Sequence, residues 1–493
     1  MVESNSSTGI DPTSTSIDSI LAKEFYSLSF QDRNKIHDEM HGVSCCSPKE
    51  NPVLIAESLE KLEQELESLP DTDSNEMYLM SQALYDRKDS TQAGGSYVND
   101  KAFRLRFLRT ELFDPSGAAT KMASFLNVVG HLFGEYALQR PIRLSDFTEE
   151  EMQAFRTGNL QLLPFRDRSG RRIIVGVEGL AIQFSSKTRY KILFYLLWVA
   201  GEDLETQRKG IVVVIWPVSD VAIKHLKNKD SLIQTQKEQL KGTPVRTCSY
   251  HFCVPDNPLF QVLRIIFTMS LEKRKLSRLK FHVGHPTELQ YSVKGYGIPV
   301  DHIPLTETGN VKTQNLRMWM KLRTSVEGDK DPATKIIECP GSNDVLFRPS
   351  KLIKGHPGNV KFQSLIESYH EKGMGVTAAS KEIVAIIIQD DGRILAWDKR
   401  GWWTVVTDPT QMQFKVSVSL RDYKKKNRAK DQVSDSSTFV FQQQKGGKKR
   451  RRLDEVSSPS SSSSSSSSLP IYTQKLFCDV LDRSLEFRSM HAT

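Results

Sequence analysis

Apolar residues in the first third of the chain recur at the three- and four-residue spacing that is typical of helices. The clearest case is residues 54–69, where five apolar side chains follow at spacings of 4, 3, 4 and 3 before Pro70 ends the pattern. This helix packs within its own domain or pairs with a second copy as a coiled coil, and its two heptads favour the first alternative. Similar spacing predicts helices within residues 19–41 and over residues 101–111, 117–134 and 148–158.

From residue 171 the pattern changes to short β-branched runs that alternate with helical stretches. Strands are predicted at residues 171–177, 210–216, 245–254 and 278–284. Helices are predicted at residues 191–200, 220–240, 258–270 and 287–294. Strands that alternate with helices imply βαβ units and a mostly parallel sheet, so the predicted fold class is α/β.

The pattern divides the chain into six segments. We predict disorder over residues 1–17, a helical N-terminal segment over 18–75, the α/β module over 76–323, a linker over 324–341, a small α+β domain over 342–423 and a disordered basic, Ser-rich tail over 424–493. Within the small domain, helices are expected at residues 359–370 and 377–389, strands at 393–397 and 402–406, and a further helix from Pro409.

The net charge of +9 is unevenly distributed along the chain. The first 100 residues carry 7 basic and 19 acidic side chains, whereas residues 101–340 carry 36 and 24. An acidic head before a basic body indicates an anionic partner for the body or an intramolecular role for the head.

The start of the chain is polar and shows no signal peptide, and no apolar run reaches the roughly 18 residues of a membrane span. The 6 cysteines are sparse and unevenly spaced, which is typical of free thiols in a reducing compartment. We therefore expect a soluble cytoplasmic protein, with a nuclear location as the alternative. The oligomeric state and the protein partners stay open.

Catalytic motifs are missing from the sequence, which has no GxxxxGK[ST], GxSxG, HExxH, GxGxxG or CxxC pattern. Cys248, His251 and Cys253, with His282 and His285, come nearest to a metal cluster. Strand neighbours alternate between faces, so packing in the core is favoured over a zinc site. We expect no enzyme activity, no metal and no cofactor.

Several short motifs occur in an order that resembles the Sec14-like (CRAL-TRIO) lipid-binding family. They are FRLRFLRTELFDPSGAATKM, LPFRDRSGRRIIVG with its Asp167, Gly170 and Arg171, GIVVVIWPV, and the series from VRTCSYHFCVPDNP to YGIPVDHIPLTETG. The segment ILAKEFYSLSFQDRNKIHDEMHGV is similar to one in an algal subgroup of this family. The sequence departs from the family at Trp216-Pro217 and at Thr308-Gly309-Asn310, so no polar headgroup ligands are transferred.

The resemblance implies a non-enzymatic protein that binds or transfers a lipid or another hydrophobic molecule. A gating helix at residues 258–270 would open during transient contact with a membrane surface, and it would close again over one bound hydrophobic molecule. Candidate pocket residues are Val213, Ile215, Phe252, Val254, Leu263, Ile266, Phe267 and Met269. Each of them is also compatible with ordinary core packing. Lys273, Arg274 and Lys275 are candidates for contact with anionic headgroups or for a solvated turn.

The C-terminal part resembles an uncharacterised domain common in algal proteins, on its N-D-V-L motif, its H-P-G-N motif and its GRILAWDKRGWWTVV segment. Phe347-Arg348-Pro349 replaces the glycine-rich triplet that usually follows N-D-V-L. His356-Pro357-Gly358-Asn359 is interpreted as a helix start.

The basic surplus of the last third lies in residues 421–452, which carry 12 basic and 3 acidic residues. Lys448, Lys449, Arg450, Arg451 and Arg452 form a candidate for nuclear import. The alternative function is therefore a nuclear regulatory or nucleic-acid-binding protein that acts through the C-terminal domain and the tail, with an import receptor or nucleic acid as partner.

Overall fold

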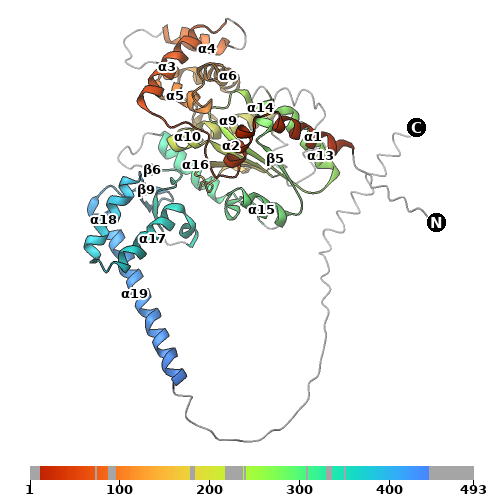
Figure 1. The fold of residues 1–493 in the computed structure, drawn as a ribbon. Coiled ribbons are helices and arrows are strands. Elements are labelled where there is room, and N and C mark those ends of the chain that lie inside the picture. Colours follow the sequence, from red (N-terminus) through yellow and green to blue (C-terminus); the bar gives the residue numbers. More distant parts are fainter. Residues whose placement is uncertain are drawn as a thin grey trace, which may run out of the picture. The chain divides into compact units, whose positions relative to one another are not determined.

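A group of helices precedes the first sheet in this computed structural model, which describes residues 12–70, 72, 75–86, 96–177, 184–216, 237, 240–306, 309–328, 336–348 and 351–442. These helices are α1 (Pro12–Tyr26), α2 (Phe30–Met40), α3 (Pro52–Glu67), α4 (Glu76–Asp86), α5 (Lys101–Thr110), α6 (Pro115–Phe133), α7 (Tyr136–Gln139) and α8 (Glu149–Arg156), with short 3-10 turns η1 (Tyr97–Asn99) and η2 (Leu144–Asp146). Helices α3, α4, α5 and α6 pack together. Helix α1 packs instead on α13 (Pro258–Ser270) and α14 (Lys273–Leu276), which lie between the last two strands of the first sheet in the sequence (Figure 1).

Helix α3 shows how the N-terminal pattern becomes structure. Asn51 caps its first turn by accepting a hydrogen bond from the backbone N–H of Leu54 at 2.8 Å, and Pro52 takes the first helical position. Leu62 and Leu66 are buried in a core shared with α5 and α6. The apolar face of this helix therefore packs within its own domain.

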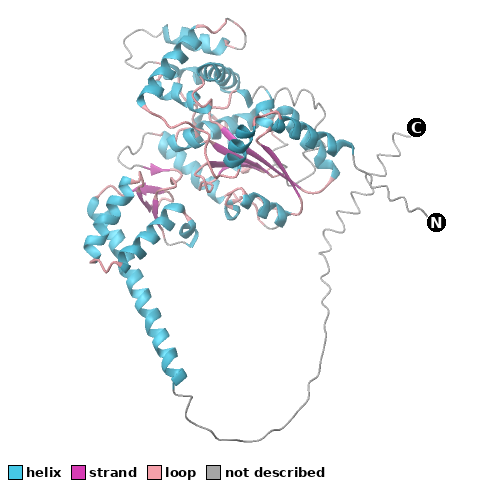
Figure 2. Ribbon diagram, viewed as in Figure 1, coloured by secondary structure: helices cyan, strands magenta, loops and turns pink. Residues whose placement is uncertain are grey.

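Five strands form the first sheet in the order β1-β2-β3-β4-β5. They are β1 (Leu160–Leu162), β2 (Arg172–Gly176), β3 (Ile211–Ile215), β4 (Thr247–Val254) and β5 (Leu279–Val283). Strands β1 and β2 are antiparallel and all other neighbours are parallel, which confirms the predicted mostly parallel α/β sheet. The helices around it are α9 (Ser186–Ala200), α10 (Leu204–Lys209), α13 (Pro258–Ser270), α14 (Lys273–Leu276) and α15 (Pro286–Gly295), followed by η4 (Val300–His302) (Figure 2).

The two faces of this sheet carry separate apolar cores because successive residues of a strand point to opposite sides. On one face, Val212 and Val214 of β3 pack with Leu289 and Val293 of α15. On the other face, Ile215 of the same strand packs with residues of β4, β5 and α13. The predicted ligand site belongs to this second face.

A second, smaller sheet has the strand order β6-β9-β8-β7. Its strands are β6 (Ile336–Ile337), β7 (Val345–Phe347), β8 (Ile394–Trp397) and β9 (Trp403–Val405), and its helical elements are η5 (Lys351–Gly355), α17 (Pro357–Glu371), α18 (Val376–Gln389) and α19 (Pro409–Gln442). The β7–β8 pair is parallel and the two other pairs are antiparallel. Phe362, Ile366 and Ile383 of the helices pack with Val345 and Ile394 of the sheet, which makes this region α+β.

The predicted linker over residues 324–341 contains regular structure toward both of its ends, and its residues 329–335 lie outside the described residues. It contains the end of helix α16 (Gln314–Glu327) and all of β6, and neither element was predicted. Its polar residues form ion pairs: Glu338 accepts hydrogen bonds from Arg172 at 2.8 Å and from Arg323 at 3.4 Å. The polar residue Glu338 of this segment is therefore held by ionic contacts with little exposure to solvent.

Helices extend into both of the segments that were predicted to be disordered. Helix α1 starts at Pro12, inside the segment over residues 1–17, and α19 continues to Gln442, past the predicted start of the tail at Lys424. The chain divides into two compact units at Lys426 and Asn427. The predicted helix over residues 220–240 falls almost entirely outside the described residues, as does the tail beyond Gln442.

Candidate functional site

Four of the candidate pocket residues meet in one apolar cluster beneath α13. Ile215 of β3, Phe252 and Val254 of β4 and Phe267 of α13 pack together, with Phe281 of β5 at the edge. The ring centroids of Phe252 and Phe267 are 4.3 Å apart, and those of Phe252 and Phe281 are 5.5 Å apart. We call this set of five side chains the β3–α13 slot. Aromatic rings fill the slot in this conformation.

The remaining candidates lie around the slot. Val213 packs with Tyr250 beside the β3–α13 slot, and it also contacts the core shared by helices α3, α5 and α6. Ile266 of α13 is buried, whereas Met269 is 54% exposed and Ile265 39% exposed. Leu263 lies on α13, but its side chain is outside the described residues. Helix α13 therefore has an inner apolar face toward the sheet and a second, outer apolar strip, because Ile265 and Met269 are four residues apart.

An ion pair joins α13 to the N-terminal helix α1. The Nη2 atom of Arg264 donates to Oδ1 of Asp18 in α1 at 2.7 Å. The Arg264 guanidinium carbon also lies 4.9 Å from the centre of the Phe281 ring, so this buried cation caps the slot from the α13 side. On α1, Leu21 packs with residues that follow α13, including Leu271. Helix α1 thus covers part of the predicted gate.

The basic residues after α13 face in two directions. Lys273 and Arg274 are exposed, and Arg274 is 3.3 Å from Glu111. Lys275 points inward, where its Nζ atom donates to the Leu240 carbonyl at 3.1 Å. Burial, with the nearby charge of Lys121, lowers the pKa of Lys275 to about 8. Two of the three predicted headgroup candidates therefore reach solvent.

Two of the residues that came nearest to a metal cluster in the sequence, His251 and His282, form a buried neutral pair instead. His251 and His282 share a hydrogen bond of 3.0 Å, and His251 also bonds to the Ser249 hydroxyl at 3.0 Å. Burial, and then the neighbouring His282, lower the pKa of His251, while burial and Lys280 lower that of His282 to about 4. Cys253 lies opposite His282 in the β4–β5 register, the Cys248 thiol donates to the Lys209 carbonyl, and His285 is the residue before α15. No group of three metal-ligating side chains occurs among the described residues.

The acidic head supplies carboxylates to the basic body. Glu39 of α2 is fully buried, and its Oε1 atom accepts from Arg246 at 2.7 Å and from the Cys46 backbone at 2.9 Å, while Oε2 accepts from Arg278. Burial raises the pKa of Glu39, but the two guanidinium groups outweigh it and lower the pKa to about 2. Arg171 also donates to the Glu39 carbonyl. We call Glu39, Arg171, Arg246 and Arg278 the Glu39 cluster.

A second carboxylate repeats this arrangement. Glu50 accepts two hydrogen bonds from Arg109, at 2.8 and 2.9 Å, and two from Arg208, both at 3.0 Å. Hydrogen bonds from Arg109 and then from Arg208 lower the pKa of Glu50 to about 2. Of the two alternatives that the charge distribution left open, these contacts favour an intramolecular role for the acidic head. The individual partners were not predicted.

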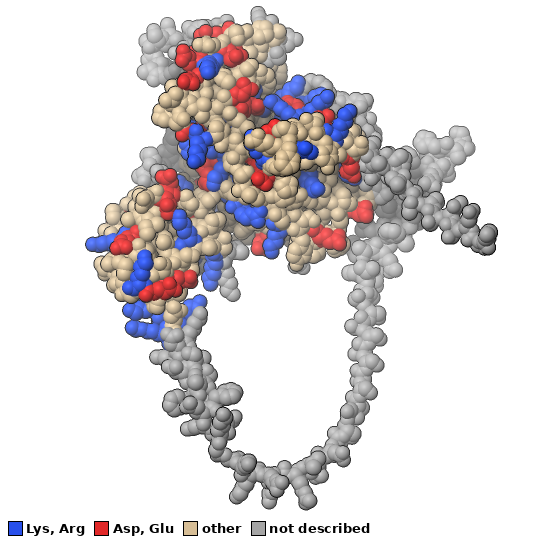
Figure 3. All heavy atoms as spheres, in the orientation of Figure 1, with Lys and Arg blue, Asp and Glu red and all other residues tan. Residues whose placement is uncertain are grey.

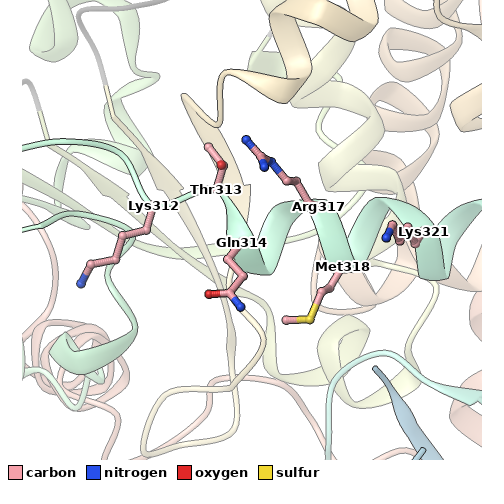
Figure 4. Close-up of a pocket in the computed structure, with 6 residues that line it drawn as sticks. All are labelled: Lys312, Thr313, Gln314, Arg317, Met318 and Lys321. Carbon is pink, nitrogen blue, oxygen red and sulfur yellow. The ribbon is translucent and has the colours of Figure 1, made fainter. Parts of the chain in front are cut away.

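A pocket of about 520 Å³ opens along the first turns of α16. It is lined by Lys312, Thr313, Gln314, Arg317, Met318 and Lys321 (Figure 4). The turn between β8 and β9 approaches the same place, since a methyl group added at Gly401 would lie 3.7 Å from the Met318 sulfur. This pocket was not predicted from the sequence, because helix α16 was not predicted.

Exposed lysines also continue along α19. Lys424, Lys425 and Lys426 are exposed, and Figure 3 shows Lys and Arg side chains gathered where the described part of this helix ends. The import candidates Lys448, Lys449, Arg450, Arg451 and Arg452 lie outside the described residues. No described helix is both long and apolar enough to cross a membrane.

Comparison with known proteins gives a family for the C-terminal part alone. No curated protein matches the chain. A solved structure described as "Crystal structure of Sfh5" is 11% identical and aligns with 57% of this chain and all of that chain, but its TM-score of 0.28 is too low to carry an argument. Residues 344–422 match the family described as "Domain of unknown function (DUF6824)", which confirms the predicted resemblance to an uncharacterised domain.

Proposed function

We propose that this protein binds a lipid or another hydrophobic molecule in the β3–α13 slot, without catalysing a reaction. The observation that carries the proposal is the two-sided apolar character of α13. Its inner face, through Phe267, packs on Phe252, while Ile265 and Met269 are exposed on the outer face. A helix with apolar side chains on both faces is suited to lie on the sheet in one state and on an apolar surface in another.

In the proposed mechanism, α13 moves away from the sheet at a membrane, and an acyl chain takes the place of Phe267 against Phe252. Each methylene group removed from water contributes about 0.8 kcal/mol, so one acyl chain compensates for the lost ring contacts. The Arg264–Asp18 ion pair has to break for this movement, because it ties α13 to α1.

Contact with the membrane would begin at the outer strip. Ile265 and Met269 would enter the headgroup region, and Lys273 and Arg274 follow four and five residues after Met269. A basic residue near an anionic membrane surface contributes about 1 kcal/mol. The proposal therefore predicts faster transfer from anionic vesicles than from neutral ones.

The test is transfer of a labelled phospholipid between vesicles, together with native mass spectrometry of protein purified from cells. Met269→Glu should slow transfer severalfold without changing the melting temperature, because Met269 is largely exposed. Val360→Glu on α17 is the matched control, since Val360 is 53% exposed and Met269 54%. The proposal fails if no hydrophobic molecule copurifies and no labelled lipid, phospholipid or sterol, exchanges.

A second candidate function rests on the exposed Lys424, Lys425 and Lys426 of α19. With the basic residues 448–452 they form a series suited to an import receptor or to nucleic acid. A fluorescent fusion, with and without residues 448–452, separates this function from a purely cytoplasmic one. Exclusion of both fusions from the nucleus would remove the second candidate.

A further inference from the structure

The pocket along α16 is lined by cations that have no carboxylate partner in the described part of the chain. It is lined by Lys312, Arg317 and Lys321, and among the described residues none of these cations forms an ion pair. Arg317 and Lys321 are four residues apart on α16, so their like charges repel each other across one helical turn. The free protein therefore keeps an unfavourable charge arrangement around an open pocket.

On the opposite face of the same helix, carboxylates balance the charge of a basic residue. Arg323 is buried, and its guanidinium group is bonded to Glu202 at 2.7 Å, to Glu327 at 2.8 Å and to Glu338 at 3.4 Å. On this face of α16 one arginine thus has three carboxylate partners, of which Glu327 belongs to α16 and the two others to neighbouring segments, whereas the two cations on the other face have none among the described residues. The contrast indicates that the missing anion at the pocket comes from outside the described chain.

The shape and the neutral groups of the pocket narrow the class of anion. A volume of about 520 Å³ exceeds that of a single inorganic ion and falls in the range of small-molecule sites, roughly 300 to 1,000 Å³. Figure 4 shows the side chains of Lys312 and Arg317 extending in different directions, so these cations do not converge on one point. Thr313 and Gln314 add a hydroxyl and an amide as neutral hydrogen-bonding groups.

We infer that this pocket binds a ligand that carries two or more phosphate groups. Separate phosphates suit separate cations, because each Lys or Arg makes its own charge-assisted hydrogen bonds to phosphate oxygens. Such a ligand is either a free organic or inorganic polyphosphate or the phosphorylated headgroup of a lipid. The site is distinct from the β3–α13 slot, and the inference does not depend on the proposed function.

Calorimetric titration of the full chain with pyrophosphate at low ionic strength tests the inference. We expect binding that weakens with added salt. The double variant Arg317→Glu/Lys321→Glu should weaken it about tenfold or more, since each exposed ionic contact accounts for about fivefold. Both residues are exposed, so the variant should keep its melting temperature. The matched control is Lys294→Glu/Lys381→Glu, which makes the same charge change on exposed residues of α15 and α18.

Vesicle sedimentation separates the two sources of phosphate. Binding to phosphatidylcholine vesicles that contain a bisphosphorylated lipid, but not to phosphatidylcholine alone, would assign a lipid headgroup. Binding of pyrophosphate without that vesicle difference would assign a free polyphosphate. The inference is overturned if neither probe binds, or if the pocket variant and the control variant weaken binding equally, because net charge alone would then explain the effect.

Discussion

The Glu39 cluster and the pocket along α16 carry the same kind of charge in opposite settings. In the first, Arg246 and Arg278 are bonded to a carboxylate that is fully buried. In the second, Arg317 and Lys321 face solvent and have no partner among the described residues. The number of basic residues in the sequence does not show this difference, because the difference depends on where the acidic residues lie in the folded chain. Paired arginines hold the acidic head on the body, and unpaired ones remain available to a ligand.

The largest effect is expected from Glu39→Gln. The substitution leaves Arg246 and Arg278 without their shared carboxylate, and breaking a buried pair typically costs about 3 to 5 kcal/mol. Urea unfolding followed by circular dichroism measures the loss. Glu63→Gln is the control, because its side chain is 58% exposed in a pair with Arg104 and should change stability by less than about 1 kcal/mol. Equal effects of the two variants would show that the Glu39 cluster is no more important to stability than a surface pair.

Acidification should weaken the protein in two steps. His282 has a folded pKa of about 4 against its usual 6.5, so the unfolded chain takes up the proton first and stability falls as pH drops from 6.5 toward 4. Glu39 has a folded pKa of about 2 against 4.5, so its contribution is complete above pH 4.5 and is lost as pH falls toward 2. The histidine step is worth about 3 kcal/mol.

Urea midpoints measured across this pH range check both steps. His282→Gln should make the upper part of the profile less steep and leave the lower part, and Glu39→Gln should do the reverse. Part of each slope should remain, because the pKa values of His251 and Glu50 are also lowered. A single transition shared by both variants would show that the two buried sites do not titrate independently. The experiment also sharpens the comparison, since protonation of Glu39 leaves its arginines without a carboxylate, as in the α16 pocket.

How much of this arrangement is visible in the sequence depends on the range of the interactions involved. The strands at β3 and β4 and the helix α13 were predicted because long apolar runs show their period locally. Strands β1, β6 and β7 are two or three residues long and were not predicted, whereas β9, which is equally short, lies within a longer apolar run at residues 402–406 that was predicted. The apolar stripe of α16 is interrupted by the buried Arg323, so it did not stand out as a helix.

The candidate sites follow the same rule. Four pocket candidates share one face of the sheet because alternation along a strand can be derived from sequence. Glu39 and Arg278, by contrast, are 239 residues apart, and no local pattern joins them. The three cations of the α16 pocket are plain in the sequence, but their lack of carboxylate partners is a property of the folded chain.

The Asp18–Arg264 pair is intermediate between the buried Glu39 cluster and the exposed cations of the α16 pocket, because Asp18 is 64% exposed and Arg264 is buried. Asp18→Asn should weaken the contact between α1 and α13 by about 1 kcal/mol, the upper end for an exposed pair. We expect amide exchange of α13 to become about fivefold faster by mass spectrometry, with lipid transfer accelerated in parallel. Asp301→Asn, at an exposed carboxylate away from α13, is the control. Unchanged exchange in α13 would mean that the pair does not restrain the gate.

The smallest effect is expected from Arg317→Gln in the free protein. Removing one of two like charges at this spacing should stabilise the chain by about 0.3 kcal/mol, a small rise in melting temperature. The same substitution at Arg156, which is 2.6 Å from Glu149, removes an attraction and should give no rise. Replacing an arginine that has a purely structural role lowers the stability of the protein. A gain in stability on replacement of Arg317, together with weaker pyrophosphate binding, would therefore identify a cation whose role is to bind a ligand. A loss of stability at Arg317 would instead place it with the paired arginines of the Glu39 cluster.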